Sequence, residues 1–122
     1  MNNSTTKEII QQYYNEISKK GDWQSFISDD ITFTSTGKIT YTKNEYVEAT
    51  TRFLRVVKDL KINEFIVEAN KACITVEYSL QSPSGNTSSC EVAEVLMVKD
   101  NKIYSSCIFF DTASFRNFMA QG

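Results

Sequence analysis

A single glutamate lies among apolar residues in the segment CEVAEVLMV, residues 90–98. Alternate residues of a β-strand point to the same face of a sheet, so Glu94 shares a face with Val92 and Leu96. Burial among such residues disfavours the charged form of a carboxylate and pushes the group towards its neutral form. A neutral carboxyl group donates a hydrogen bond. Glu94 is therefore a candidate for binding an oxygen atom of a small molecule.

The composition argues against several other kinds of site. The chain of 122 residues has no histidine, and its cysteines, Cys73, Cys90 and Cys107, show no paired spacing, so we expect no metal site. The 13 basic and 15 acidic residues are well mixed, and no basic stripe indicates binding to nucleic acid. We expect no cofactor either.

We expect the protein to act in the cytoplasm. Three isolated cysteines are typical of a protein that keeps its thiols reduced. The first residues, MNNSTTKEII, are polar and contain no positive segment followed by an apolar run, so no secretory signal is indicated. No apolar stretch approaches the roughly 20 residues needed to cross a bilayer, and we expect no contact with membranes.

The pattern of apolar residues predicts one α+β domain over residues 1–122. T-x-x-E capping boxes at Thr5 and Thr42 each precede apolar residues at helical spacing. The second half alternates apolar and polar residues between short polar turns, which indicates a meander of antiparallel strands. The helices are expected to cover one face of this curved sheet. Helices are expected near 5–20, 22–27, 42–57 and 111–119, and strands near 31–36, 38–41, 61–69, 72–80, 88–98 and 101–111.

Two long segments carry a resemblance to a known superfamily. Residues 13–35, YYNEISKKGDWQSFISDDITFTS, contain a helix, a Gly-Asp pair at Gly21, Trp23, and an Asp-Asp pair at 29–30 that is interpreted as a turn before the first strand. Residues 94–115, EVLMVKDNKIYSSCIFFDTASF, contain a hairpin that closes on Phe-Asp. In this order the motifs resemble the nuclear transport factor 2-like superfamily, which includes SnoaL-like polyketide cyclases and ketosteroid isomerases.

The resemblance implies a particular α+β architecture for a single SnoaL-like domain. A strongly bent, mostly antiparallel sheet would wrap like a cone around a long N-terminal helix, with an apolar pocket at the open end. Many members of the superfamily are enzymes, whereas others only bind a ligand or a partner. The fold therefore does not define the function.

The resemblance also implies roles for individual residues. Tyr14 and Glu94 match the tyrosine and the protonated aspartate that donate hydrogen bonds to an oxyanion in ketosteroid isomerases. The catalytic base of the isomerases is not matched, because Phe-Thr-Ser-Thr, residues 33–36, occupies its position and none of these side chains removes a carbon-bound proton near neutral pH. Asp111 and an ionised Glu94 are then the only candidates for a base.

Structural roles stay open for the same residues. A structural role for Glu94, as the partner of a lysine or a tyrosine hydroxyl, is the commoner case for such a residue, and Tyr14 is also explained as a core residue. Asp111 is also the expected N-cap of the last helix. The sequence does not separate core residues from those lining a pocket. The candidate ligand-binding set comprises Tyr14, Trp23, Phe33, Phe53, Glu94, Leu96, Ile108 and Phe110.

Three hypotheses for function follow. The first is a domain that binds a small, largely apolar molecule with a carbonyl or hydroxyl group, anchored by Glu94 and Tyr14. The second is an isomerase or cyclase that acts through an enolate, and the third is an interaction module without a ligand. We also expect a homodimer formed by the outer face of strands 90–98 and 102–111. The residues expected on that face are Ala93, Val95, Met97, Ser105, Cys107 and Phe109.

Overall fold

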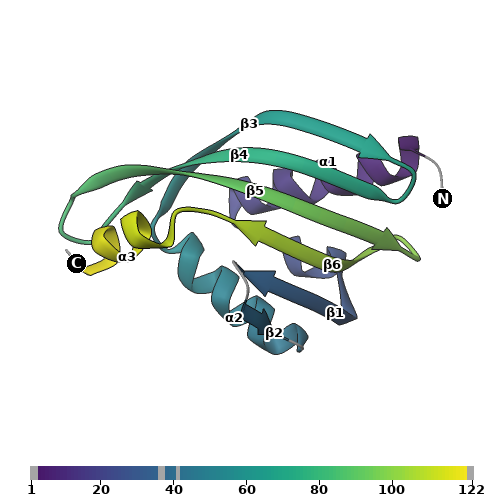
Figure 1. Ribbon diagram of the computed structural model, residues 1–122, viewed down its shortest axis with the longest axis horizontal. Coiled ribbons are helices and arrows are strands. Elements are labelled where there is room, and N and C mark those ends of the chain that lie inside the picture. The colour runs from purple at the N-terminus through teal and green to yellow at the C-terminus, as the bar shows by residue number, and fades with distance from the viewer. Residues whose placement is uncertain (1–2, 36–37, 41, 121–122) are drawn as a thin grey trace.

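A computed structural model describes residues 3–35, 38–40 and 42–120 of the chain. Helices come first and a run of long strands follows, as expected, with a short helix at the C-terminal end (Figure 1). The elements are α1 (Asn3–Lys19), the 3-10 helix η1 (Trp23–Phe26), β1 (Ile27–Ser35), β2 (Lys38–Thr40), α2 (Lys43–Leu54), β3 (Val57–Glu68), β4 (Lys71–Gln81), β5 (Thr87–Lys99), β6 (Lys102–Phe109) and α3 (Thr112–Ala120).

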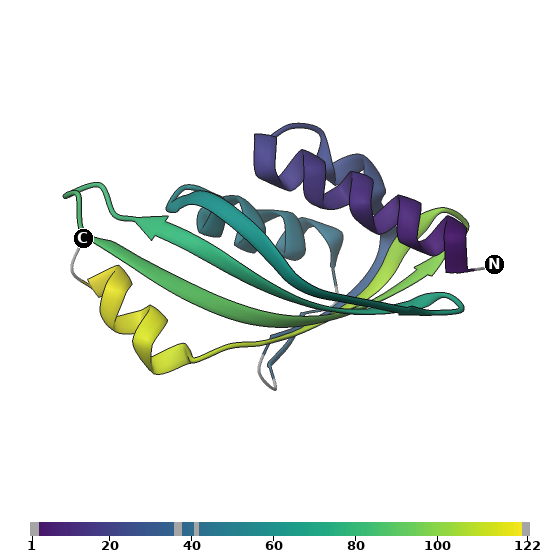
Figure 2. The same ribbon diagram turned by 90° about the horizontal axis from the view of Figure 1, so that it is seen from above.

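The strands form one bent sheet in the order β2-β1-β6-β5-β4-β3. β1 runs parallel to β6, and the other neighbouring pairs are antiparallel. The sheet curves around α1 and α2, which lie together on its concave face (Figure 2). This confirms the predicted α+β architecture, a mostly antiparallel sheet wrapped around the N-terminal helix.

The core lies between the concave face of the sheet and one side of α1. Along β4, alternate residues from Ala72 to Leu80 are buried, and the residues between them are mostly exposed. This period of two gives the strand an inner and an outer face. α1 contributes Ile10, Tyr13 and Ile17, each no more than 3% exposed, from successive turns of the helix.

Two local predictions need correction. Asp29 and Asp30 do not form a turn before the first strand. They are exposed residues within β1, where its register against β6 shifts between Ile27 and Thr32, and this irregularity takes the place of the expected turn. The capping box at Thr5 is also wrong, because α1 already begins at Asn3.

The N-terminal ends of α2 and α3 are capped by side chains. Thr42 accepts a hydrogen bond of 3.1 Å from the backbone N–H of Glu45, as the T-x-x-E pattern predicts. Asp111 accepts bonds from the backbone N–H and the hydroxyl of Ser114, at 3.1 and 2.8 Å. These caps fix the start of the two helices that approach the site described next.

Candidate ligand-binding site

A cavity of about 520 Å³ lies between α2 and the inner face of the sheet. Its walls are largely aromatic, and α3 contributes Phe115 to the lining. Phe53 of α2 meets the rings of Tyr78 and Phe115, with ring centroids 4.9 and 5.6 Å apart. Phe110 meets Phe115 edge-on at 5.7 Å. Tilted and edge-on contacts of this kind are the arrangements that aromatic rings prefer.

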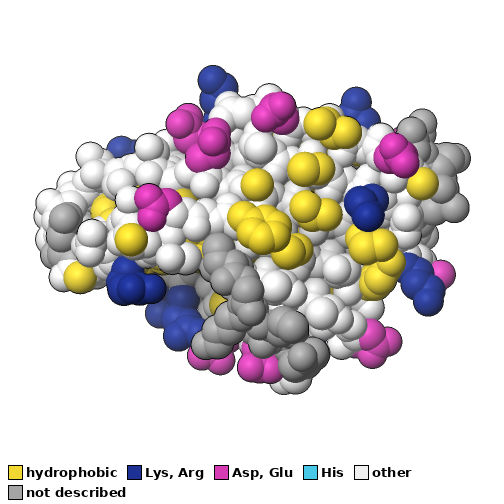
Figure 3. Space-filling view, in the orientation of Figure 1, with side chains coloured by type: hydrophobic (Ala, Val, Ile, Leu, Met, Phe, Trp, Pro, Cys, Tyr) yellow, Lys and Arg dark blue, Asp and Glu magenta, His cyan; other side chains and the backbone are white. Residues whose placement is uncertain are grey.

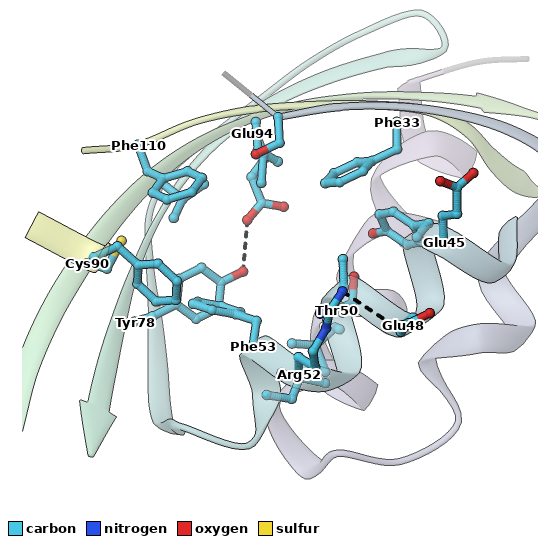
Figure 4. A pocket seen from close by; sticks show the side chains of 18 of the residues that line it. Phe33, Glu45, Glu48, Thr50, Arg52, Phe53, Tyr78, Cys90, Glu94 and Phe110 are labelled. Atoms are coloured by element: carbon cyan, nitrogen blue, oxygen red, sulfur yellow. Dashed lines mark hydrogen bonds and ion pairs between the residues drawn. The ribbon is translucent and has the colours of Figure 1, made fainter. Parts of the chain in front are cut away.

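Glu94 lies on the wall of this cavity with both carboxylate oxygens hydrogen-bonded. Tyr14 donates to Oε1 over 2.5 Å, and Tyr78 donates to Oε2 over 2.8 Å. Figure 4 shows Glu94 extending from the sheet towards the Tyr78 hydroxyl, between the rings of Phe33 and Phe110. The Glu94 side chain is therefore both buried and held in one direction.

Three elements position this carboxyl group. On β5, Glu94 pairs with Ile74 of β4 and Ile108 of β6, so its cross-strand neighbours are apolar. Tyr78 reaches it from the inner face of β4, and Tyr14 reaches it from α1. A buried carboxyl group needs such partners, because leaving it unpaired would cost several kcal/mol.

Burial changes the protonation of the whole group. Desolvation raises the pKa of Glu94, and the hydrogen bonds from Tyr14 and Tyr78 partly oppose that rise by favouring the carboxylate. Desolvation, reinforced by the negative charge of Glu94, also raises the pKa of both tyrosines well above 10. The tyrosines therefore remain protonated donors, while Glu94 retains its proton to a higher pH than an exposed glutamate.

A second hydroxyl cluster lies in the same cavity wall. The hydroxyl oxygens of Tyr13 and Tyr46 are 2.6 Å apart, and either of them can be the donor. The hydroxyl groups of Thr50 and Ser106 also favour the ionised form of Tyr46, but their influence on its pKa is smaller than that of burial. Burial raises the pKa of Tyr46 to about 12. Phe33 packs edge-on against the Tyr46 ring at a centroid distance of 4.8 Å.

Charged residues occur on the α2 side of the cavity. Glu45, Glu48 and Arg52 belong to its lining, and all three are exposed. Glu48 and Arg52 form an ion pair of 3.6 Å along the helix (Figure 4). The cavity thus has a buried polar group on the sheet and exposed charges on the helix.

The predicted site residues divide into four groups. Those that line the cavity are Phe33, Phe53, Glu94, Ile108 and Phe110. Tyr14 supports Glu94 without being part of the lining, and Trp23 and Leu96 are buried in the core. Asp111 is exposed, caps α3 and lies outside the lining.

Sequence analysis missed Tyr78 as the second partner of Glu94. Its signal was available, because Tyr78 continues the alternation of Ile74 and Val76 on the inner face of β4. At the position of the isomerase base, Ser35 lines the cavity, while Thr36 lies outside the described residues.

Two further observations concern the described part of the chain. It brings together no group of three or more histidine, cysteine, aspartate or glutamate residues that could hold a metal ion. Among its helices, none combines the length and the apolar character needed to span a bilayer.

Several solved structures have a fold similar to that of this chain. It is similar to AclR from Streptomyces galilaeus, assigned as a hydroxylase, with a TM-score of 0.83 and 12% identity over 98% of this chain and 87% of that one. A SnoaL-like protein from Jannaschia sp. CCS1, assigned as a polyketide cyclase, gives a TM-score of 0.82 and 9% identity over 98% and 94% of the two chains. The chain has the nuclear transport factor 2-like fold.

A third similar structure contains a small molecule. TerC, co-crystallised with polyporic acid, has a TM-score of 0.76 and 16% identity, covering 93% of this chain and 96% of TerC. The sequence matches no known protein-family profile and no curated protein. At such low identities the likeness to solved structures shows the fold alone, and function has to be argued from the site.

Proposed function

We propose that this nuclear transport factor 2-like domain binds a compact, largely apolar small molecule that carries a carbonyl or hydroxyl group. The observation that carries the proposal is Glu94, a buried carboxyl group held by Tyr14 and Tyr78 on the wall of an aromatic cavity. Apolar cavities of several hundred Å³ with a few fixed polar groups are typical ligand sites. TerC, which has a similar fold, was co-crystallised with polyporic acid, and this supports a ligand here.

The protonation of Glu94 decides which ligand atom it binds. When Glu94 is ionised, the protons of Tyr14 and Tyr78 both point at the carboxylate, and the group only accepts from a ligand hydroxyl. When Glu94 is neutral, the Glu94 carboxyl group, Tyr14 and Tyr78 carry three protons, but only two hydrogen bonds join these groups. One proton is then left to donate to a ligand carbonyl, either from Glu94 or from Tyr78, both of which line the cavity.

Native mass spectrometry of the full chain purified from its own host tests the proposal. We expect a bound organic mass that is lost in Glu94→Leu, because leucine removes both the donor and the acceptor. Glu91→Gln is the matched control, since Glu91 is an exposed residue of the same strand. The proposal is wrong if the wild-type protein carries no organic mass and binds none of the aromatic probes described in the next section.

Enzymatic action through an enolate is the second candidate function. Such an enzyme would use a protonated Glu94 and Tyr78 as hydrogen-bond donors to the oxyanion, but the other carboxylates of the cavity, Glu45 and Glu48, lie exposed on α2. General acid–base catalysis typically contributes 10²–10⁴-fold. We expect no turnover of a β,γ-unsaturated ketone above that of Glu94→Gln, and a rate that falls sharply in this variant would favour an enzyme.

We further propose a homodimer formed by the outer face of the sheet. One row across that face consists of paired residues Ile66, Cys73, Val95 and Cys107, and the next contains Phe109. Ile66 is 60% exposed and Phe109 is 49% exposed. Figure 3 shows hydrophobic side chains gathered over the middle of this face, with acidic groups along its edge. A two-fold axis through the patch would bury it, and sedimentation tests this.

The expected location of the protein stays the cytoplasm. Cys73, Cys90 and Cys107 are free thiols, and Cys73 is exposed on the outer face. Free thiols of this kind suit a reducing compartment. Measurement of the thiol state of the protein in its own host tests this expectation, since an oxidised Cys73 would contradict it.

A further inference from the structure

The hydroxyl cluster of Tyr13 and Tyr46 lies in the cavity wall but makes no hydrogen bond to Glu94, whose partners are Tyr14 and Tyr78. Tyr13 and Tyr14 follow each other on α1, with their rings 5.2 Å apart at 71°. Tyr14 turns to Glu94, whereas Tyr13 turns to Tyr46 on α2. The two neighbouring tyrosines thus belong to two separate hydrogen-bonded groups, and both groups reach the lining of one cavity.

Counting protons identifies a spare donor in this second group. Tyr13 and Tyr46 carry two hydroxyl protons, and one hydrogen bond of 2.6 Å joins the two oxygens. A phenol hydroxyl both donates and accepts hydrogen bonds. Whichever hydroxyl accepts this bond therefore keeps its own proton for another partner. Both tyrosines line the cavity.

The two groups are close enough to act on one molecule. Tyr14 belongs to the first group and Tyr13 to the second, and the centroids of their rings are only 5.2 Å apart. Between them the surface is aromatic, with the ring of Phe33 against Tyr46 and near Glu94 (Figure 4). A flat ring in the cavity can therefore present one oxygen to each group.

We propose that Tyr13 and Tyr46 form a second oxygen-binding position, so that the ligand is a flat, unsaturated ring compound with two oxygen substituents. This inference rests on the proposed ligand-binding function and narrows it. Glu94 and Tyr78 bind the first oxygen, and the cluster around Tyr46 binds the second. A hydroxyl or carbonyl oxygen fits the second position, because the cluster supplies a donor and its remaining lone pairs accept.

Binding of matched probes tests the second position. Naphthalene, 2-naphthol and a set of dihydroxynaphthalene isomers have the same ring system with no, one or two oxygens. We expect the best dihydroxynaphthalene to bind wild-type protein about threefold to tenfold more tightly than 2-naphthol, as one added hydrogen bond predicts. Titration calorimetry or the fluorescence of the naphthols measures this ratio.

A double variant then locates the additional bond. Tyr13→Phe/Tyr46→Phe keeps the ring packing and removes both hydroxyls, so we expect it to bring the affinity ratio close to one while binding of 2-naphthol changes little. Tyr104→Phe is the matched control, because the Tyr104 hydroxyl contacts Met97 and lies outside the cavity lining. This control should leave the ratio unchanged.

The outcomes separate the two proposals. If no naphthol binds and no organic mass accompanies the protein, the ligand-binding function itself fails. If 2-naphthol binds but no isomer with two oxygens binds more tightly, the second position fails and the first stands. An affinity ratio that persists in Tyr13→Phe/Tyr46→Phe would also overturn it, because a purely structural pair affects stability and leaves the ratio unchanged.

Discussion

Each face of β5 carries residues that do not suit their surroundings, and the two faces differ in kind. On the inner face, Glu94 is a polar residue in apolar surroundings, and it is only 7% exposed. On the outer face, Val95 and Met97 are apolar residues that the chain itself only half covers. Two tyrosine hydroxyls are hydrogen-bonded to the inner polar residue, whereas none of the helices in the described part of the chain covers the outer apolar residues (Figure 2).

The difference indicates where each face obtains its partners. A buried polar group needs hydrogen-bond partners within the folded chain, and Tyr14 and Tyr78 are those partners for Glu94. An exposed apolar patch has no such requirement inside the chain, and a second molecule is the usual way to cover it. The inner face is therefore suited to a small ligand, and the outer face to a protein surface.

Truncation of the neighbouring residues Leu96 and Met97 should give the largest difference in stability between the two faces of β5. Leu96 is 1% exposed, so Leu96→Ala leaves a cavity in the core and should lower the free energy of unfolding by about 2–5 kcal/mol. Met97→Ala on the outer face should cost less than about 1 kcal/mol in the monomer. Chemical denaturation of both variants at low protein concentration measures the contrast, and equal losses would contradict it.

Val95→Glu should break the outer face without affecting the inner one. Val95 lies in the middle of the proposed contact, and an unpaired charge buried there should weaken the dimer by about 3 kcal/mol or more, roughly 100-fold in the dissociation constant. The monomer should fold normally, because in a single chain this side chain faces water.

Sedimentation of wild-type protein and variant at micromolar concentration is the measurement. The variant should sediment as a monomer of 13.9 kDa, and the wild-type protein as a dimer. Glu77→Gln, at an exposed position of the same sheet, is the control and should remain dimeric. A wild-type monomer would disprove the interface, as would a dimer that survives Val95→Glu unchanged.

Much of the fold could be predicted from the sequence, because the spacing of apolar residues along a strand or helix shows which face is buried. The alternation around Glu94 assigned both faces of β5 correctly, and the capping box at Thr42 gave the start of α2. Thr5 is not a cap, because it lies within α1, which begins at Asn3. Its neighbour Thr6 is buried and donates to the backbone oxygen of Ala69, so this part of α1 is held by the hairpin between β3 and β4.

The candidate site was less predictable, since it depends on contacts across the fold. The resemblance assigned Tyr14 and Glu94 to one oxygen-binding site, and in the structure the two side chains are hydrogen-bonded to each other. Tyr78 and the pair of Tyr13 and Tyr46 depend on which inward-facing residues meet, and spacing along one strand or helix does not contain that information. Nor does spacing separate Trp23 in the core from residues that line the cavity.

Glu94→Gln should change how stability depends on pH. Burial raises the pKa of Glu94 in the folded state above its ordinary value of 4.5, so the folded protein binds this proton more tightly than the unfolded chain. The stabilisation is complete below pH 4.5 and is lost as the pH rises through the folded-state pKa. Each unit of difference corresponds to about 1.4 kcal/mol.

Denaturation of both proteins between pH 4 and 9 tests this expectation. The free energy of unfolding of wild-type protein relative to Glu94→Gln should fall as the pH rises, because glutamine does not titrate. Glu91→Gln, on the same strand but exposed, should retain the wild-type dependence. A relative stability that rises with pH would mean that the tyrosine hydrogen bonds outweigh desolvation.

Asp111→Ala should give the smallest effect, with the opposite dependence on pH. Hydrogen bonds from the backbone N–H and the hydroxyl of Ser114 lower the pKa of Asp111, so its stabilisation is present at neutral pH and is lost as the pH falls through that lowered pKa. Loss of this cap loosens α3, which brings Phe115 to the cavity, and should lower the melting temperature by a few degrees at pH 7. Asp22→Ala is the matched control, since Asp22 stands at the start of η1 without a side-chain cap bond, and it should leave the melting temperature unchanged. If the deficit of Asp111→Ala persists at pH values where the Asp111 carboxyl is protonated, capping is not its cause.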